Sequence, residues 1–192
     1  MKKPVNEMRE HILNVARALM TRKGYTAVGL NEVLSTAGVP KGSFYYYFKS
    51  KEEFGQALLQ EYFEEYLSRI EPILKQQASG AESLLQYFRY WSETQHDNSV
   101  DNKCLVVKLG AEVCDLSEVM RQVLEKGTAR IVNLITATID RGFEDGSIVA
   151  CDSVALAESM DQLWLGASLM AKVNRSTQPF LSALTMTKSL LG

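Results

Sequence analysis

Apolar residues recur every three or four positions along almost the whole chain, which is the spacing of amphipathic helices. The two-residue alternation that is typical of half-buried strands is absent. The pattern therefore predicts an all-α protein of about nine helices. The first helix begins near Asn6, a plausible N-cap, and ends at Gly24, where a left-handed helix end is favourable. Its apolar face consists of Ile12, Val15, Ala16, Leu19 and Met20.

Two short helices are predicted next, over residues 30–37 and 41–48, with Gly38 in the tight turn between them. Ser50 then opens a fourth helix, because its side chain can accept the amide hydrogen of Glu53 in a capping box. Two short helices that are joined by a glycine-containing turn and braced by a longer first helix form a helix-turn-helix.

The remaining helices are longer and predict a second helical bundle. We therefore expect a helix-turn-helix domain at residues 1–50 and a second domain at residues 51–192. The fourth helix should bend or end near Pro72, and residues 96–103 should form a loop. The other helices are predicted at about 82–95, 104–114, 117–143, 152–174 with Asp152 as its cap, and 179–191.

Composition narrows the class of protein. With 192 residues, 46% of them hydrophobic and 23% charged, the chain suits a soluble globular protein. No apolar run approaches the roughly 18 to 20 residues that cross a bilayer, and the first residues resemble no signal peptide, so we expect a cytoplasmic protein. The net charge of −2 hides an asymmetry, because residues 1–51 hold nine basic and three acidic residues and the rest hold 12 and 20. This asymmetry indicates that only the first module meets a polyanion.

Residues that could carry catalysis or bind a metal are sparse. The three cysteines, Cys104, Cys114 and Cys151, form no C-x-x-C pair, and His11 and His96 lie in different predicted helices. Phosphate-binding glycine loops and the G-x-S-x-G and H-E-x-x-H motifs are absent. We expect no metal, no cofactor and no enzymatic activity. A thiol-dependent enzyme would need a base beside Cys104, and neither histidine is predictably near it.

The third predicted helix carries a run of aromatic residues between lysines. Because successive residues turn by 100°, Phe44 and Phe48 lie on one side and can pack against the first two helices. The tyrosines could form a half-buried aromatic face, or stack on RNA bases. The flanking lysines, the basic module and the preceding turn instead favour recognition of duplex DNA. The residues that face away from the two phenylalanines are Ser43, Tyr46 and Tyr47, with Tyr45 between the two sides.

DNA recognition by this helix has a physical basis. Its first turn, at Lys41 and Gly42, presents free amides and the positive end of the helix dipole. Hydroxyl and ammonium groups suit phosphates, and tyrosine side chains are long enough to reach base edges in the major groove.

The sequence TAGVPKGSFYYYFKSKEEF, residues 36–54, closely resembles the DNA-binding signature of the TetR family of bacterial repressors. The resemblance spans about residues 9–60 and implies a homodimer that binds a palindromic DNA operator. Gly29 departs from the Ser or Thr that caps the second helix in many members, and Thr26 or Asn31 is expected to substitute. The resemblance places Lys41, Gly42, Tyr45 and Tyr46 for base or groove contacts, and Ser43, Tyr47 and Lys51 on phosphates.

The resemblance also implies that the last two long helices form the dimer interface, within a domain that senses the effector. Independently, these helices hold more apolar surface than one small bundle readily buries on itself. The alternative is that the same residues form an intramolecular core. They are Leu163, Trp164, Leu165, Leu169, Met170, Phe180, Leu181, Leu184 and Leu190.

Cys104 lies in a setting that favours a reactive thiol. It follows Asn102, a plausible N-cap, so its sulfur is expected in the first turn of a helix, near Lys103 and Lys108. A helix N-terminus and ammonium groups stabilise the thiolate, which is the reactive form. Cys114 has apolar neighbours and is expected to be inert packing, whereas Cys151 is expected to be exposed in a loop.

The stretch CLVVKLGAEVCDLSE, residues 104–118, and LWLGASLMAK, residues 163–172, resemble the branch of that family typified by the NemR repressors. That branch responds to electrophiles and reactive chlorine through a cysteine. The resemblance implies that Cys104 is the sensor and Lys172 its partner, and that oxidation or alkylation releases the operator and derepresses detoxification genes. The alternative is a repressor induced by reversible binding of a small apolar ligand in the second domain, in a pocket lined by Tyr87, Trp91 and Trp164.

Overall fold

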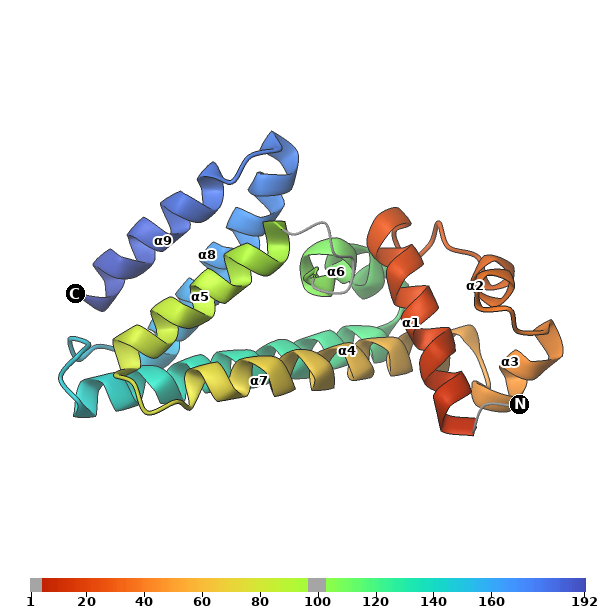
Figure 1. The fold of residues 1–192 in the computed structure, drawn as a ribbon, viewed down its shortest axis with the longest axis horizontal. Coiled ribbons are helices and arrows are strands. Elements are labelled where there is room, and N and C mark those ends of the chain that lie inside the picture. The colour runs from red at the N-terminus through yellow and green to blue at the C-terminus, as the bar shows by residue number, and fades with distance from the viewer. Residues whose placement is uncertain (1–4, 97–102) are drawn as a thin grey trace. The chain divides into compact units, whose positions relative to one another are not determined.

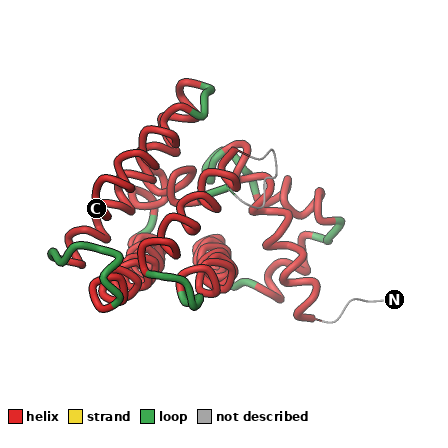
Figure 2. Tube along the Cα trace, turned by 60° about the vertical axis from the view of Figure 1, so that its left-hand side comes forward, coloured by secondary structure: helices red, strands yellow, loops and turns green. Residues whose placement is uncertain are grey.

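The structure is a computed structural model that describes residues 5–96 and 103–192. Within these residues it consists of nine α-helices and no strand (Figures 1 and 2), which confirms the all-α prediction. The helices are α1 Val5–Lys23, α2 Leu30–Ala37, α3 Lys41–Tyr47, α4 Lys51–Leu74, α5 Gly80–His96, α6 Leu105–Leu116, α7 Glu118–Glu144, α8 Ser153–Asn174 and α9 Gln178–Leu191.

The described chain divides into two compact units. Of the described residues, unit 1 contains 5–63 and 103–125, and unit 2 contains 64–96 and 126–192. Unit 1 therefore joins α1, α2 and α3 with the beginning of α4, all of α6 and the beginning of α7. The predicted boundary at residue 50, between the helix-turn-helix domain and the second domain, stays a prediction.

The helix ends of unit 1 form where glycine permits a left-handed backbone. α1 ends at Gly24, with φ +99°, and the amide of Gly24 donates to the carbonyl of Met20 at 2.8 Å. α2 ends at Gly38, with φ +67°, and the following amide, that of Val39, donates to the carbonyl of Leu34 at 2.9 Å. These bonds satisfy carbonyls that the helix ends would otherwise leave unpaired, and they fix the turn before α3.

The core of unit 1 includes an aromatic cluster of Phe44, Phe48 and Phe54. Their ring centroids lie 5.3 Å apart for Phe44 and Phe48, 5.4 Å for Phe44 and Phe54, and 5.0 Å for Phe48 and Phe54. All three side chains are buried, as predicted for the first two. The anchor of α3 therefore includes a residue of α4, and the packing of its phenylalanines against α1 and α2 stays a prediction.

The capping box before α4 forms with one difference. The amide of Glu53 donates to the Ser50 hydroxyl at 3.0 Å, as predicted. The Glu53 carboxylate, however, accepts the amide of Lys49 at 2.8 Å rather than that of Ser50. α4 then continues through Pro72 and ends two residues later, at Leu74.

Unit 2 is built around tryptophans in α5 and α8, with α9 packed against both helices (Figure 1). The rings of Phe88 and Trp164 stack at 4.8 Å with an interplanar angle of 13°. At the beginning of α5, a Cβ atom on Gly80 would lie 2.4 Å from the Cα atom of Gly142 in α7, so only glycine allows this approach of two backbones. The predicted cap of α8 is confirmed, since the Asp152 carboxylate accepts the amide of Ala155 at 3.0 Å.

Candidate functional site

The side chains of α3 divide between the core and solvent. Phe44 and the following Phe48 are buried, whereas Tyr45 is 60% and Tyr46 71% exposed. Tyr45, which the helical wheel placed between the two faces, thus lies on the outer side. Ser43 and Tyr47 are half-buried, and Lys41, Gly42 and Lys51 are exposed.

The outer tyrosines Tyr46 and Tyr47 stand next to each other, and two cations lie over nearby buried rings. The rings of Tyr46 and Tyr47 meet edge to face at 5.1 Å. The Lys51 ammonium lies 5.2 Å from the centroid of the Tyr25 ring, and the Arg9 guanidinium lies 5.3 Å from that of Phe48. This surface offers hydroxyls, ammonium groups and flat rings together, which are the groups that contact phosphates and base edges.

The expected substitute for a cap on α2 is not present. Gly29 is the N-cap, in an extended conformation, and no side chain caps the helix. Thr26 donates its hydroxyl to the carboxylate of Glu112 instead, and Asn31 already lies within the helix. The prediction that Thr26 or Asn31 caps α2 is therefore wrong, because a carboxylate that is distant in sequence takes the threonine hydroxyl.

Cys104 is buried, with 7% of its surface exposed, and is itself the N-cap of α6. Its carbonyl accepts the amide of Lys108 at 3.2 Å. The helix therefore begins at Leu105, one residue later than predicted, and the proposed cap Asn102 lies outside the described residues. Lys172, in the last turn of α8, belongs to unit 2, and its pairing with Cys104 stays a prediction.

The other two cysteines are both exposed, and none of the three forms a disulfide. For Cys151, in the loop between α7 and α8, exposure was predicted. For Cys114 the prediction of inert packing is wrong. The buried side of α6 follows Leu105, Leu109 and Val113 at intervals of four residues, so the next residue is turned about 100° away from that side.

The three residues predicted to line a ligand pocket, Tyr87, Trp91 and Trp164, are closely packed in unit 2. Each has at most 2% of its surface exposed. The indole of Trp91 donates to Ser168 Oγ at 2.8 Å, and that of Trp164 to Thr187 Oγ1 at 2.9 Å. Their lining of a ligand pocket stays a prediction.

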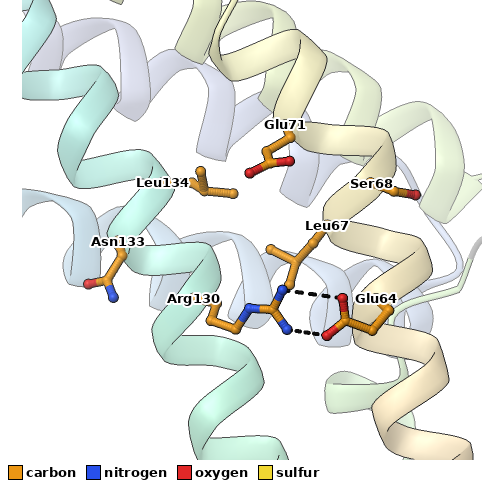
Figure 3. Close-up of a pocket in the computed structure, with 7 residues that line it drawn as sticks. All are labelled: Glu64, Leu67, Ser68, Glu71, Arg130, Asn133 and Leu134. Atoms are coloured by element: carbon orange, nitrogen blue, oxygen red, sulfur yellow. Dashed lines mark hydrogen bonds and ion pairs between the residues drawn. The ribbon is translucent and has the colours of Figure 1, made fainter.

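Unit 2 also contains a cavity of about 350 Å³ between α4 and α7 (Figure 3). The guanidinium of Arg130 from α7 and the carboxylate of Glu64 from α4 pair directly with each other in its lining, and hydrogen bonding from Arg130 lowers the pKa of Glu64. Its walls are therefore partly charged, unlike the aromatic pocket that was predicted. It is lined by Glu64, Leu67, Ser68, Glu71, Arg130, Asn133 and Leu134.

Two acidic residues that sequence reasoning did not single out are distinctive in the structure. Asp161 in α8 is 7% exposed, it forms no ion pair within the described residues, and burial raises its pKa to about 6. Glu112 in α6 accepts hydrogen bonds from the turn after α1. Asp161 lies outside the quoted motifs, and Glu112 lies within the stretch 104–118 but only its three-dimensional contacts single it out.

Among the residues that the structure describes, no group of histidine, cysteine and acidic side chains could hold a metal ion. None of the described helices is both long and apolar enough to cross a membrane.

Two family models match the chain. One, described as "Bacterial regulatory proteins, tetR family", matches residues 12–58. The other, described as "Tetracyclin repressor-like, C-terminal domain", matches residues 80–187.

Individual proteins are similar over most of the chain. The HTH-type transcriptional repressor NemR of Escherichia coli K12 is 37% identical over 189 residues, which are 97% of this chain and 95% of the relative. The repressor DhaR of Mycobacterium sp. strain GP1 is 32% identical over 93% of this chain and 89% of its own. The crystal structure of the reduced form of E. coli NemR superposes with a TM-score of 0.91, over 97% of each chain.

Proposed function

The chain belongs to the TetR family of bacterial regulatory proteins, and we propose that it is a repressor whose release from DNA is controlled by modification of Cys104. As a TetR-type transcriptional repressor it is a DNA-binding regulator and not an enzyme. The observation that carries the regulatory part of the proposal is Cys104 itself, a buried thiol at the N-terminus of the helix that also contacts the turn after α1.

In this proposal the exposed side of α3 enters the major groove. Tyr45 and Tyr46, the most exposed aromatic residues of unit 1, reach base edges together with Lys41 and Gly42. The phosphate contacts come from Ser43, Tyr47 and Lys51. Phe44 and the aromatic cluster around it hold this helix on the unit, which keeps the outer side chains in register.

TetR-family repressors bind their operators as dimers, and we place the interface of this chain on α8 and α9. Trp164 and Phe180, two of the residues predicted for it, are instead buried within unit 2. The others leave a substantial apolar surface, which a second copy would bury. The large exposed apolar side chains on these helices are Val154, Leu169, Met170, Val173, Leu181, Met186 and Leu190.

Two features support the thiol switch. The N-terminus of a helix favours a negatively charged sulfur, and Cys104 stands at that position with Lys103 before it. The similar protein of E. coli was crystallised in a form called reduced. An electrophile such as N-ethylmaleimide would add to the thiolate through its carbon–carbon double bond, and the adduct would no longer fit the buried position of the thiol.

The role proposed for Lys172 is to stabilise the thiolate or to bond to an oxidised sulfur. If its amine bonds to oxidised sulfur, the variant Lys172→Met should change the response to hypochlorite but leave alkylation by N-ethylmaleimide in place. Equal loss of both responses would contradict that bond.

A reversible ligand is the alternative inducer, and it would have to open the packing around Trp91 and Trp164 or use another cavity. Intact-mass spectrometry distinguishes the two inducers, because only the thiol switch leaves an adduct on Cys104 at the moment of release. The DNA-binding part is tested by a mobility-shift titration with the DNA upstream of the protein's own coding sequence. Failure to shift this DNA, with a scrambled fragment as control, would contradict operator binding there.

A further inference from the structure

Glu112, in the third turn of α6, binds the turn that follows α1. Its Oε2 accepts the amide of Tyr25 at 2.9 Å, and its Oε1 accepts the amide of Thr26 at 2.6 Å. The hydroxyl of Thr26 donates to the same Oε1. One carboxylate thus accepts three hydrogen bonds from two consecutive residues that are more than 80 positions away in sequence.

Lys108 lies one helical turn before Glu112 on the same side of α6. Its ammonium group is 3.3 Å from the carbonyl of Arg22, in the last turn of α1. A helix end exposes unpaired carbonyls, and the turn after it exposes amides, so a cation and an anion spaced by four residues match the two sets of groups. We call Lys108 and Glu112 the α6 clamp.

The Glu112 carboxylate is charged at neutral pH and lies close to the backbone of Gly24. Desolvation raises the pKa of Glu112, but hydrogen bonds from Thr26 and Tyr25 and the charge of Lys108 outweigh this effect and lower it overall. Gly24 has φ +99°, and a Cβ atom there would lie 3.2 Å from Glu112 Oε2. The turn therefore favours glycine for its backbone conformation, and a side chain there would also require the carboxylate to shift by a few tenths of an ångström.

α6 is also attached at its C-terminal end. The Ser117 hydroxyl donates to Glu52 Oε1 at 2.5 Å, in the first turn of α4. Glu52 is adjacent to Lys51, whose carbonyl accepts the hydroxyl of Tyr25 at 3.3 Å. One short helix, with Cys104 as its N-cap and Ser117 as its C-cap, thus holds both the end of α1 and the beginning of α4, the two helices that flank α2 and α3.

We propose that Glu112, assisted by Lys108, is a positioning residue for operator binding and couples it to the thiol of Cys104. The coupling rests on the proposed function above. Glu112 lies eight positions after Cys104, which is about 12 Å along α6 at about 1.5 Å per residue. A displacement of α6 by about 1 Å at Glu112 would lengthen hydrogen bonds of 2.6 to 2.9 Å beyond bonding distance and release the turn.

The variant Glu112→Gln tests the clamp, because an amide has one acceptor oxygen and turns its NH₂ group toward a backbone donor. Asp115→Asn is the matched control. It makes the same change of charge on the same helix, at an exposed residue whose side chain forms no hydrogen bond or ion pair within the described chain. Each variant is measured as the full-length protein by hydrogen exchange of the amides of Tyr25 and Thr26. The dissociation constant for upstream DNA is then measured before and after N-ethylmaleimide.

We expect Glu112→Gln to speed hydrogen exchange at both amides. It should also weaken DNA binding of the unmodified protein by about tenfold, since fewer molecules hold α1, α2 and α3 in the binding geometry. The ratio of dissociation constants after and before alkylation should decrease, because the variant has already weakened the Glu112 contacts that alkylation would break. Asp115→Asn should match the wild type in all three measurements.

The proposal is overturned if the dissociation constant of unmodified Glu112→Gln for DNA stays within twofold of that of Asp115→Asn. It is also overturned if this constant rises while the ratio of dissociation constants after and before alkylation is unchanged. If Glu112→Gln loses its helical circular dichroism signal, Thr26→Val takes its place in the test, because this variant removes only the hydroxyl donor. We expect Thr26→Val to weaken DNA binding by about threefold and to change the other two measurements in the same direction. Failure of the proposed function shows separately, as wild-type protein that does not bind DNA or that keeps it after alkylation. The hydrogen-exchange measurement depends neither on DNA binding nor on release by alkylation.

Discussion

The ring of Phe54, in the first turn of α4, packs edge to face against the ring of Phe44 in α3, at 5.4 Å and an interplanar angle of 70°. Both side chains are almost completely buried. The helix that carries the exposed tyrosines is therefore seated on a residue that follows the capping box, and the packed unit extends beyond residue 50.

Replacement of this ring should destabilise unit 1. We expect Phe54→Ala to lower the free energy of unfolding by about 3 to 5 kcal/mol, because it removes a buried ring and leaves a cavity beside two others. The measurement is urea-induced unfolding followed by circular dichroism. Phe54→Leu, which keeps most of the volume, should lose much less; an equal loss would contradict the role of ring packing.

Tyr46 should separate DNA binding from stability. Because its side chain is 71% exposed, Tyr46→Ala should change the free energy of unfolding by less than about 0.5 kcal/mol. The same change should weaken operator binding by about tenfold, as expected for the loss of 1 to 3 kcal/mol of base contact. Fluorescence anisotropy with labelled upstream DNA measures the binding. Tyr90→Ala, on α5, is the control, and unaltered binding by Tyr46→Ala would remove Tyr46 from the interface.

Asp161 should make stability depend on pH. Burial raises its pKa to about 6, above that of an unfolded aspartate, so between about pH 4 and pH 6 the folded protein binds more protons than the unfolded one. Its contribution therefore lowers the free energy of unfolding as the pH rises through this window. Asp161→Asn should gain on the order of 2 kcal/mol over the wild type near pH 7 and little near pH 4. Urea unfolding across this range measures the difference between the two proteins, and a gain that is independent of pH would contradict the assignment.

The apolar surface of α8 should be required for dimer formation. Leu169 and Val173 are spaced by four residues and are 50% and 65% exposed. A buried charge at either position has no partner, so Leu169→Glu or Val173→Glu should shift the protein from dimer to monomer. Light scattering coupled to size-exclusion chromatography measures the mass. Val149→Glu, at an exposed residue before α8, should remain dimeric, and dimers of all three variants would place the interface elsewhere.

The elements of this fold could be predicted because their ends are encoded locally. Gly24, Gly38 and Asp152 end or begin helices where the structure places those ends, within one or two residues. The outward direction of Tyr46 could be predicted for the same reason, since helical geometry is sufficient once Phe44 is assigned to the core. The chain's similarity to a known repressor then supplies the function that these elements serve.

Contacts between distant segments could not be predicted. Glu112 looks like any exposed acid of a helix, and only the fold brings it to the turn at Tyr25. Cys114 was predicted to be buried from its apolar neighbours, but the rotation of α6 about its axis, which its packing sets, turns it outward. The hydrogen bonds of the Trp91 and Trp164 indoles to Ser168 and Thr187 likewise join residues that are distant in sequence, and the pocket predicted at these residues stays a prediction.

In the proposed switch, modification of Cys104 releases the operator. The direct measurement is the dissociation constant for labelled upstream DNA, by fluorescence anisotropy, for the wild type, Cys104→Ser and Cys114→Ser, each before and after N-ethylmaleimide. Cys114 is the exposed thiol on the same helix and serves as the matched control. We predict that alkylation weakens binding at least about tenfold, or about 1.4 kcal/mol, in the wild type and in Cys114→Ser, and leaves Cys104→Ser unchanged. Release of Cys104→Ser to the same extent as the wild type would contradict the claim.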